Sequence, residues 1–340
     1  ILEDLPRLDY SGGASCPALL LEPQRTNSIP HSEYFSDWLL DGNGDGQSVT
    51  PNYAISPEGV QNAYRLQLSF INGTYSRIRK SVTDSYSGAG VFSVYLKTND
   101  RSTKTISMRW GGSGAVSKTI TGEWQRFDVS GTAIYTLAQD HELFIGSAEG
   151  DSDLVDLSIY GAMQESGNYS TSYIPTMGSA VTRSEDTAIK TGISSLLNDN
   201  EGTLFLDMKA LIDGGGITRR LSISDATTDN RVSIEYDEVA GRIKSFMSIG
   251  GITTGTLTSS GNVQTDTNKI AITYTASIYK MFLNGVNVAN DITLVGTPIG
   301  LDRMQFANGA NNSPLQGLVN QVLYFPTALT DSEAIALTTI

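Results

Sequence analysis

Apolar and polar residues alternate with a period of two along most of this chain. In residues 91–97, one side of an extended segment carries Phe92, Val94 and Leu96, with polar residues between them. Alternation of this kind indicates β-strands that turn one face to a core and the other to solvent. Because short connections separate these segments, they predict antiparallel sandwiches without helical crossovers. The pattern recurs in residues 64–68, 105–110, 154–160, 231–236 and 270–274.

The alternation is lost over residues 166–186, which we interpret as a linker or a docking strap. We therefore expect an all-β chain with two antiparallel β-sandwich domains in tandem, residues 31–165 and residues 187–340. Residues 1–30 contain several prolines. Proline suits an edge element, so we expect this lead-in segment to dock on the first domain.

Two local signals lie in the second domain. Asn284-Gly285 sits between two alternating runs and suits a type I′ hairpin turn, because both central positions need positive φ. Residues 330–333, Thr-Asp-Ser-Glu, match a capping box and predict a short helix.

Composition limits the functions to consider. The formal net charge of −13 disfavours a phosphate backbone, so we expect no nucleic acid partner. Cys16 is the single cysteine and has no partner for an internal disulfide. No apolar run is long enough for a membrane helix, so we expect no membrane insertion. The chain begins at Ile1 without an initiator Met, so we expect a fragment whose missing part can hold a catalytic activity.

Several segments carry a resemblance to known proteins. The first domain opens with PRLDY, CPALLLEPQRTN and SEYFSDW in residues 6–38 and closes with YGAMQE, TSYIPT and RSED in residues 160–186. These segments resemble the entry and exit of lectin-like modules in phage and prophage tail proteins. The interior, including residues 122–127, is similar to jelly-roll carbohydrate-binding modules. Residues 187–340 look like a concanavalin A/laminin-G-like sandwich, because of FLNG at 282–285 and the last strand and its capped helix.

The resemblance implies a jelly roll followed by a lectin-like sandwich. It also implies polysaccharide binding outside the cell or on the virion surface, and a homotrimer through the full-length tail protein. The binding faces of these modules vary, so it transfers no binding residue. It requires no cofactor and leaves a structural calcium ion open.

Cations and tyrosines on the non-core sides of first-domain strands are the candidate glycan site. Tyrosine rings stack on sugar C–H faces, and arginine forks bind carboxylates or sulfates in a bidentate way. If the strands share a sheet, their outer face suits an acidic polysaccharide such as a uronate polymer or a bacterial capsule. The alternative is a solvated face with ordinary cross-strand pairs. The candidates are Arg65, Tyr75, Arg77, Arg79, Tyr95, Lys97 and Arg109.

The three tryptophans divide between packing and binding. Trp38 lies at the entry of the first domain and is expected in its core. Trp124 opens a strand, where packing is favoured over ligand contact. Trp110 shares parity with Met108 but precedes a glycine-rich turn, so it is either buried or a sugar platform at the sheet rim.

Residues 41–46, Asp-Gly-Asn-Gly-Asp-Gly, reproduce the first half of a calcium loop. Asp41, Asn43 and Asp45 are the candidate oxygen ligands. The twelfth position is Asn52 where the motif needs a bidentate Glu, so a flexible acidic turn is the favoured interpretation.

No catalytic set emerges from the sequence. The two histidines, His31 and His141, offer few partners for a triad, and the acidic residues of 142–156 fit a solvated stretch. We therefore expect non-catalytic carbohydrate binding. The alternatives are a structural tail-fibre component without glycan binding, and a polysaccharide depolymerase or lyase fragment.

Overall fold

The computed structural model describes residues 5–10, 16–42, 46–70, 75–82, 88–111, 114–133, 139–145, 151–291 and 296–340. The chain forms two compact units. The first unit spans Gln24–Ser184, and the second unit spans Glu185–Ile340 together with the N-terminal segment up to Pro23. Within the described ranges, no helix is long and apolar enough to cross a membrane.

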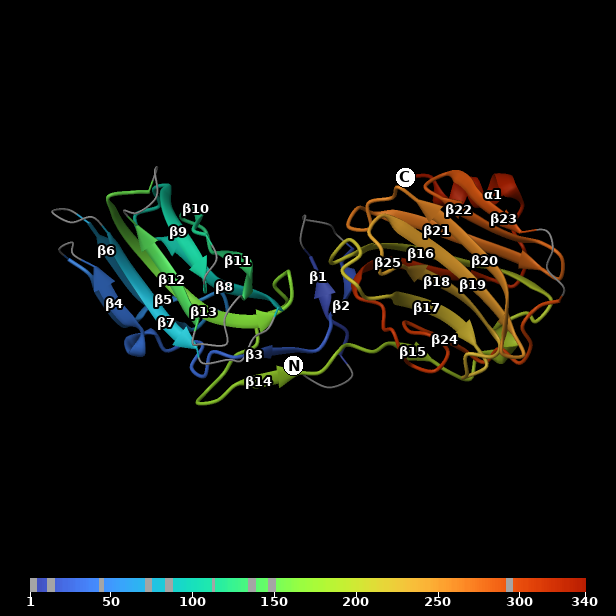
Figure 1. Ribbon diagram of the computed structural model, residues 1–340, viewed down its shortest axis with the longest axis horizontal. Coiled ribbons are helices and arrows are strands. Elements are labelled where there is room, and N and C mark those ends of the chain that lie inside the picture. The colour runs from blue at the N-terminus through green and yellow to red at the C-terminus, as the bar shows by residue number, and fades with distance from the viewer. Residues whose placement is uncertain are drawn as a thin grey trace. The chain divides into compact units, whose positions relative to one another are not determined.

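The first unit contains two five-stranded antiparallel sheets that pack face to face (Figure 1). The β13 sheet has the strand order β11-β8-β13-β6-β5, and the β12 sheet has the order β10-β9-β12-β7-β4. The strands are β4 (Leu39–Gly42), β5 (Ser48–Ile55), β6 (Gln61–Ser69), β7 (Ser76–Val82), β8 (Gly88–Thr98), β9 (Lys104–Trp110), β10 (Val116–Ile120), β11 (Gln125–Ala133), β12 (Gln139–Ile145) and β13 (Leu154–Ser166).

The strand order of this unit is that of a jelly roll. From β6 to β13 the chain passes between the two sheets, apart from the β9-β10 hairpin, and gives the orders β6-β13-β8-β11 and β7-β12-β9-β10. Two interlocked Greek keys produce these orders. Strands β5 and β4 extend the two sheets at one edge. The predicted all-β jelly-roll sandwich is confirmed.

Inward-facing residues of both sheets form the core of the first unit. Phe92 and Val94 are fully buried, as their alternation predicts. Trp110 is fully buried in the same cluster, and a Cβ added to Gly90 would lie 2.4 Å from its ring. The prediction of Trp110 as a sugar platform is therefore wrong, because the indole keeps the inward parity of Met108 to the end of its strand.

The segment predicted as a linker or a docking strap, residues 166–186, belongs to the first unit for all but its last two residues. Strand β14 (Val181–Arg183) pairs with β3 (Arg25–Asn27). The fully buried side-chain amide of Asn27 donates to the carbonyl of Ile174 at 2.8 Å. The segment is therefore a docking strap and not a linker, because strand pairing and buried hydrogen bonds hold it on the first unit.

The second unit is a second antiparallel sandwich. Its β16 sheet has the order β1-β2-β25-β16-β21-β22-β23, and its β18 sheet has the order β15-β24-β17-β18-β19-β20. The elements are β1 (Leu8–Asp9), β2 (Ala18–Leu21), β15 (Ile189–Lys190), β16 (Glu201–Ala210), β17 (Arg219–Ser224), β18 (Arg231–Tyr236), β19 (Arg242–Ile249), β20 (Ile252–Ser260), β21 (Asn268–Thr275), β22 (Tyr279–Leu283), β23 (Val286–Asp291), β24 (Arg303–Gln305), β25 (Gly317–Phe325) and α1 (Asp331–Thr338).

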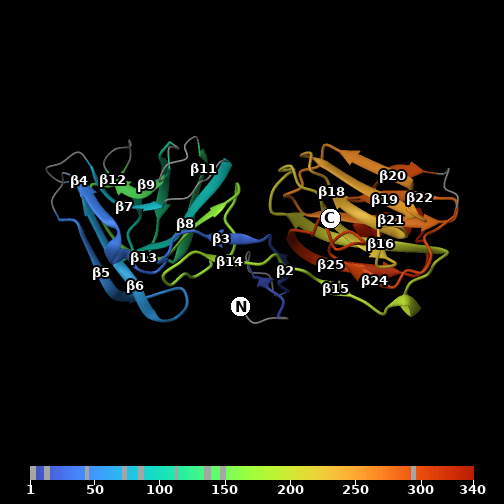
Figure 2. The same cartoon turned by 60° about the horizontal axis from the view of Figure 1, so that its bottom comes forward.

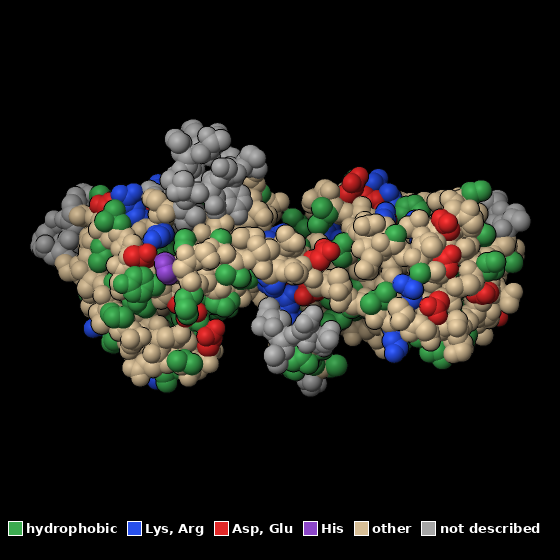
Figure 3. Space-filling model, turned by 90° about the horizontal axis from the view of Figure 1, so that it is seen from below, with side chains coloured by type: hydrophobic (Ala, Val, Ile, Leu, Met, Phe, Trp, Pro, Cys, Tyr) green, Lys and Arg blue, Asp and Glu red, His purple; other side chains and the backbone are tan. Residues whose placement is uncertain are grey.

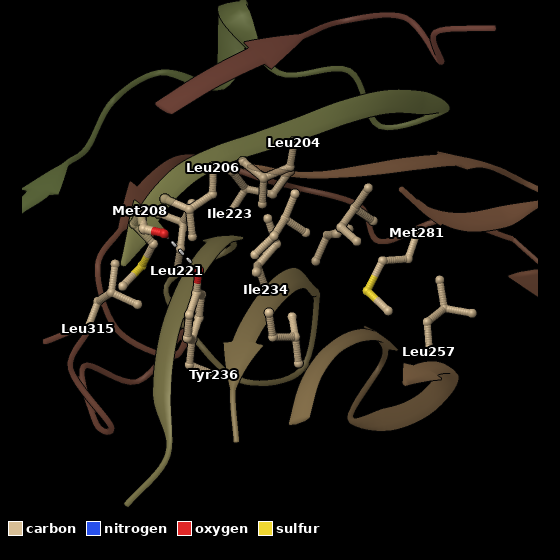
Figure 4. Packing of buried hydrophobic residues seen from close by; sticks show 14 of the residues in the cluster. Leu204, Leu206, Met208, Leu221, Ile223, Ile234, Tyr236, Leu257, Met281 and Leu315 are labelled. Atoms are coloured by element: carbon tan, nitrogen blue, oxygen red, sulfur yellow. Dashed lines mark hydrogen bonds between the residues drawn. The ribbon is translucent and has the colours of Figure 1, made fainter. Parts of the chain in front are cut away.

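Leucine, isoleucine and methionine side chains from both sheets meet in the second core (Figure 4). Leu204 and Leu206 of β16 pack with Ile223 of β17. Tyr236 is fully buried among them, and its hydroxyl donates to the Met208 carbonyl at 3.1 Å, which satisfies the polar end of the ring. The tandem sandwich prediction is confirmed.

The N-terminal segment adds strands to the second unit. Strand β2 pairs with β25, and Leu21 lies in the second core with 3% of its surface exposed. Arg7 bonds to the carboxylates of Glu22 (2.5 Å) and Asp186. The expectation that residues 1–30 dock on the first domain is therefore wrong for residues up to Pro23, because the apolar patch completes a sheet edge of the other sandwich.

Both local signals of the second unit are confirmed. Asn284 and Gly285 have φ values of 49° and 79°, as a type I′ turn requires. Thr330 accepts a hydrogen bond from the backbone N–H of Glu333, whose carboxylate accepts from the Thr330 N–H, which is a complete capping box at the start of α1.

Leu21 and Ile29 lie in different cores. Truncating each side chain should therefore destabilise only the unit whose core it belongs to. We expect Leu21→Ala to destabilise the second unit by about 2–5 kcal/mol and to leave the first unit unchanged. We expect Ile29→Ala to destabilise the first unit and to leave the second unit unchanged. Hydrogen exchange measured by mass spectrometry during denaturant unfolding distinguishes the units. Faster exchange in the first unit of the Leu21 variant would contradict the assignment of β2.

Candidate functional site

The predicted glycan-binding residues divide between the two sheets of the first unit. The β13 sheet carries Arg65, Tyr95 and Lys97, and the β12 sheet carries Arg77, Arg79 and Arg109, with Tyr75 just before β7. Both sets point away from the core between the sheets, so they lie on opposite outer faces. The prediction of one shared face is wrong, because successive jelly-roll strands enter different sheets.

On the β12 sheet, carboxylates pair with the arginines. Arg77 binds Asp41 at 2.6 Å and Glu142 at 3.0 Å, and Arg109 also bonds to Glu142. The side chain of Glu142 is only 3% exposed. The hydrogen bond from Arg77 lowers the pKa of Asp41, and the nearby charge of Arg79 adds to the effect. This face is an ionic network and not an uncompensated cationic surface.

On the outer face of the β13 sheet, three aromatic rings each have a cation against them, and one of these pairs is Tyr95 with the Arg126 guanidinium at 5.6 Å. The Arg65 guanidinium lies 4.9 Å from the centre of the Tyr53 ring, and the Lys97 ammonium lies 5.1 Å from that of Trp124. Ser158 stands between the two cations in the strand register, opposite Lys97 on β8 and Arg65 on β6. The two cations thus lie on either side of Ser158 in one transverse row, and each has an aromatic ring against it.

A polar row runs beside these rings. Asp156 accepts two hydrogen bonds from Arg65, at 3.0 and 2.6 Å, and one from the Asn99 amide at 2.6 Å. The Ser158 hydroxyl donates to the side-chain amide oxygen (Oδ1) of Asn99 at 2.6 Å. The hydrogen bond from Arg65 is the main reason that the pKa of Asp156 is lowered. Among the described residues, Lys97 has no carboxylate within ion-pair distance, so its charge is uncompensated.

We call the outer face of the β13 sheet the trough, because a side-chain hydrogen bond joins segments from its two edge strands. Trp124 precedes β11 and Ile55 ends β5, and these strands are the two edges of the sheet. The Trp124 indole N–H nevertheless donates to the Ile55 carbonyl at 3.0 Å. The β5-β6 hairpin must therefore curl over the outer face to reach the opposite edge. Strand twist and the register shifts between Thr50 and Ile55 allow this bend.

Three tyrosines pack together at one end of the trough. Tyr95, Tyr160 and Tyr173 pack with centroid separations of 5.8–6.3 Å, and both Tyr160 and Tyr173 donate to Glu33 at 3.0 and 3.2 Å. Burial is the main reason that the pKa values of Tyr160 and Tyr173 are raised. Gly161 has a φ of 64°, and a Cβ there would lie 3.2 Å from Tyr173, so the bulge needs glycine.

Sequence reasoning found Arg65, Tyr95 and Lys97 but missed Tyr53, Trp124, Asn99 and Asp156. Trp124 shares its parity with Arg126, which was a signal that it faces outward. Its contact with Ile55 depends on the curl of a distant hairpin, which alternation does not encode.

The calcium prediction rests on a loop of which the structure describes only part. Asp41 lies in β4, where its carboxylate is engaged by Arg77. Asn43 and Asp45 lie outside the described residues. In the described part of the chain, no three His, Cys, Asp or Glu side chains gather as a metal site.

Each unit also has a hollow. In the first unit, a groove of about 760 Å³ is lined by His31, Glu33, Tyr34 and Met177 among others. Both apolar and charged side chains lie near the histidine on this face in Figure 3. In the second unit, a mainly apolar groove of about 870 Å³ lies between residues 190–199 and 300–304. Neither groove includes a predicted site residue.

Comparisons with known proteins give structural likenesses only. No protein-family model and no curated protein matches the chain. Among solved structures, the chain is similar to the CBM40 of the Ruminococcus gnavus IT-sialidase bound to α2,3-sialyllactose, at 21% identity, with 42% of this chain and 84% of that chain covered and a TM-score of 0.36. It is also similar to NanB sialidase of Streptococcus pneumoniae, at 18% identity, with 45% of this chain and 26% of that chain covered and a TM-score of 0.38. A third similar structure is bacteriophage CBA120 tailspike protein 4, at 14% identity, with 41% of this chain and 21% of that chain covered and a TM-score of 0.30. Likeness at this level assigns no function.

The pairing of Asp156 with Arg65 predicts a pH dependence of stability. The folded-state pKa of Asp156 is lowered, so its stabilisation is complete above the unfolded-state pKa of about 3.9 and is lost as pH falls through the folded-state value. We expect the difference in unfolding free energy between the native chain and Asp156→Asn to be constant near neutral pH and to shrink below about pH 4. Denaturant titrations check this, with the second unit as internal reference. A difference that stays constant into strong acid would refute it.

Proposed function

We propose that the first unit is a non-catalytic carbohydrate-binding module whose glycan site is the trough of the β13 sheet. The observation that carries the proposal is the pairing of two aromatic rings, Tyr53 and Trp124, with the cations Arg65 and Lys97 on one curved face. A hydrogen-bonding row lies beside them. Sugar recognition uses rings and hydrogen-bonding groups together, because C–H faces stack on rings while hydroxyls take hydrogen bonds.

The trough binds by equilibrium contacts alone. A sugar ring stacks on Trp124, whose indole is fixed by the hydrogen bond to Ile55 and loses little freedom on binding. The partly exposed side chain of Asn99 is held by Asp156 and by the buried Ser158, and it can offer hydrogen bonds to sugar hydroxyls. The proposal assigns no catalytic residue and requires no cofactor, and a calcium ion would have a structural role.

The preferred ligand is an acidic polysaccharide. Arg65 is neutralised by Asp156, whereas Lys97 has no carboxylate partner in the described part of the chain. A uronate carboxylate next to a ring stacked on Trp124 would reach this ammonium. A single lysine gives a modest preference for acidic glycans, which repeated sites increase through avidity.

The setting that we propose is a receptor-binding part of a phage or prophage tail protein, located on the virion surface or outside the cell. Its support is the resemblance of the segments that open and close residues 1–186. In such a protein a homotrimer would present several troughs to one polysaccharide. A structural tail component would have the same two sandwiches without glycan affinity.

Affinity electrophoresis in gels containing acidic or neutral polysaccharides tests the proposal. We expect Trp124→Ala to weaken binding about tenfold, because the stacking platform is lost. We expect Lys97→Gln to remove the preference for acidic over neutral glycans and to reduce the salt dependence. Arg77→Gln, on the opposite face, is the matched control and keeps native affinity.

Two results decide against the trough. If both Trp124→Ala and Lys97→Gln keep the native affinity for polysaccharide, the trough is excluded as the glycan site. It is also excluded if only Arg77→Gln loses affinity while the melting temperature of that variant is unchanged. Absence of binding to every polysaccharide of a glycan screen would favour the structural tail component.

A further inference from the structure

The outer face of the β18 sheet in the second unit holds a second group of cations. Arg220 of β17 and Lys244 of β19 are neighbours of Glu235 on β18, in register. Arg220 bonds to Glu235 at 2.5 Å, and Lys244 bonds to Asp237. These two cations are therefore paired within the protein.

Arg231, on the same face, is different. Its Nε and Nη1 atoms are shielded from solvent and have no hydrogen-bond partner among the described residues. The fully buried hydroxyl of Ser224, opposite Arg231 in the register of β17 and β18, is also without a partner there. Desolvating a guanidinium without an acceptor is costly. An anion at the partly exposed side of Arg231 would compensate the charge of this guanidinium.

The charges around Arg231 do not fully compensate its positive charge, so an anion would be favoured there. Burial is the main reason that the pKa of Arg231 is lowered, and Arg220 adds to it, whereas Glu235 and Asp229 act in the opposite direction. None of these carboxylates lies within ion-pair distance of Arg231. Glu235 is already bonded to Arg220, so the local positive charge is only partly compensated.

An aromatic ring lies diagonally across from Arg231. Phe246 of β19 is opposite Ser233 in the register, two residues from Arg231 along β18. Diagonal neighbours on one sheet face are within reach of long side chains. Phe246 is partly exposed, and the Lys244 ammonium lies 5.9 Å from its ring centre. A ring beside an unpaired guanidinium can hold both the apolar face and the carboxylate of one sugar.

We infer that this face of the β18 sheet is a second binding site, for a carboxylated sugar such as a uronate, with Phe246 as the stacking platform and Arg231 as the carboxylate ligand. The inference does not depend on the trough of the first unit. If both sites function, one chain engages an acidic polysaccharide at two places and gains affinity through its effective concentration.

The experiment follows the Arg231 Nε–H resonance in ¹H–¹⁵N spectra of the full chain carrying Trp124→Ala, which disables the trough. We expect trigalacturonate to shift this resonance, sodium sulfate to shift it more weakly, and neutral galactotriose to leave it unchanged. In calorimetric titrations with trigalacturonate, we expect Arg231→Gln and Phe246→Ala each to weaken binding about tenfold.

Lys280→Gln is the matched control, because it removes one positive charge from the opposite sheet, where Lys280 pairs with Asp331. We expect this variant to bind trigalacturonate as the Trp124→Ala chain does. An Arg231 resonance that neither trigalacturonate nor sulfate shifts would overturn the inference, as would equal affinity in Arg231→Gln and Lys280→Gln. Because the trough is already disabled, failure here is distinct from failure of the trough.

Discussion

Each sheet in this protein must bury one face, and the other face is what remains for binding. The alternating side chains bring that constraint into every strand, since a residue that packs in the core leaves its neighbours outside. In a jelly roll the chain also changes sheet at most turns, so residues close in sequence reach opposite outer faces. Which outer residues share a face is therefore set by topology.

The distribution of carboxylates then decides which cations are available. On the β12 sheet, Asp41 and Glu142 pair with Arg77, and the face is close to neutral. On the β13 sheet, Asp156 pairs with Arg65, and no carboxylate of the described residues pairs with Lys97 beside Trp124. Internal ion pairs of this kind fix side-chain positions more than they add stability. A partly compensated face with fixed rings suits weak and selective sugar binding.

Sequence patterns were sufficient for the fold class, most strands and the inward residues, because these depend on local periodicity. They were insufficient for the ends of the domains. Leu21 lies in an apolar patch that suits either sandwich, and only its pairing with β25 shows which one it completes. Asn27 and residues 166–184 are held by buried hydrogen bonds between distant segments, for which alternation gives no signal.

The sequence predicted only those residues of the binding site whose position follows from the alternation within their own strand. The parity of Arg65, Tyr95 and Lys97 follows from their own strands. The contribution of Trp124 depends on the curl that brings Ile55 to the other edge of the sheet, and that curl is a property of the whole sheet. For Trp110 the strand's own alternation was sufficient. This residue has inward parity and is fully buried, although glycines follow it in the sequence.

The most direct test of this account is a map of backbone amide shifts for the full chain titrated with an acidic oligosaccharide. The account predicts that the largest shifts in the first unit fall on β6, β8, β13 and the turn before β11, around Trp124 and Lys97. Shifts confined to β7, β9 and β12 would place the ligand on the opposite sheet and contradict the account.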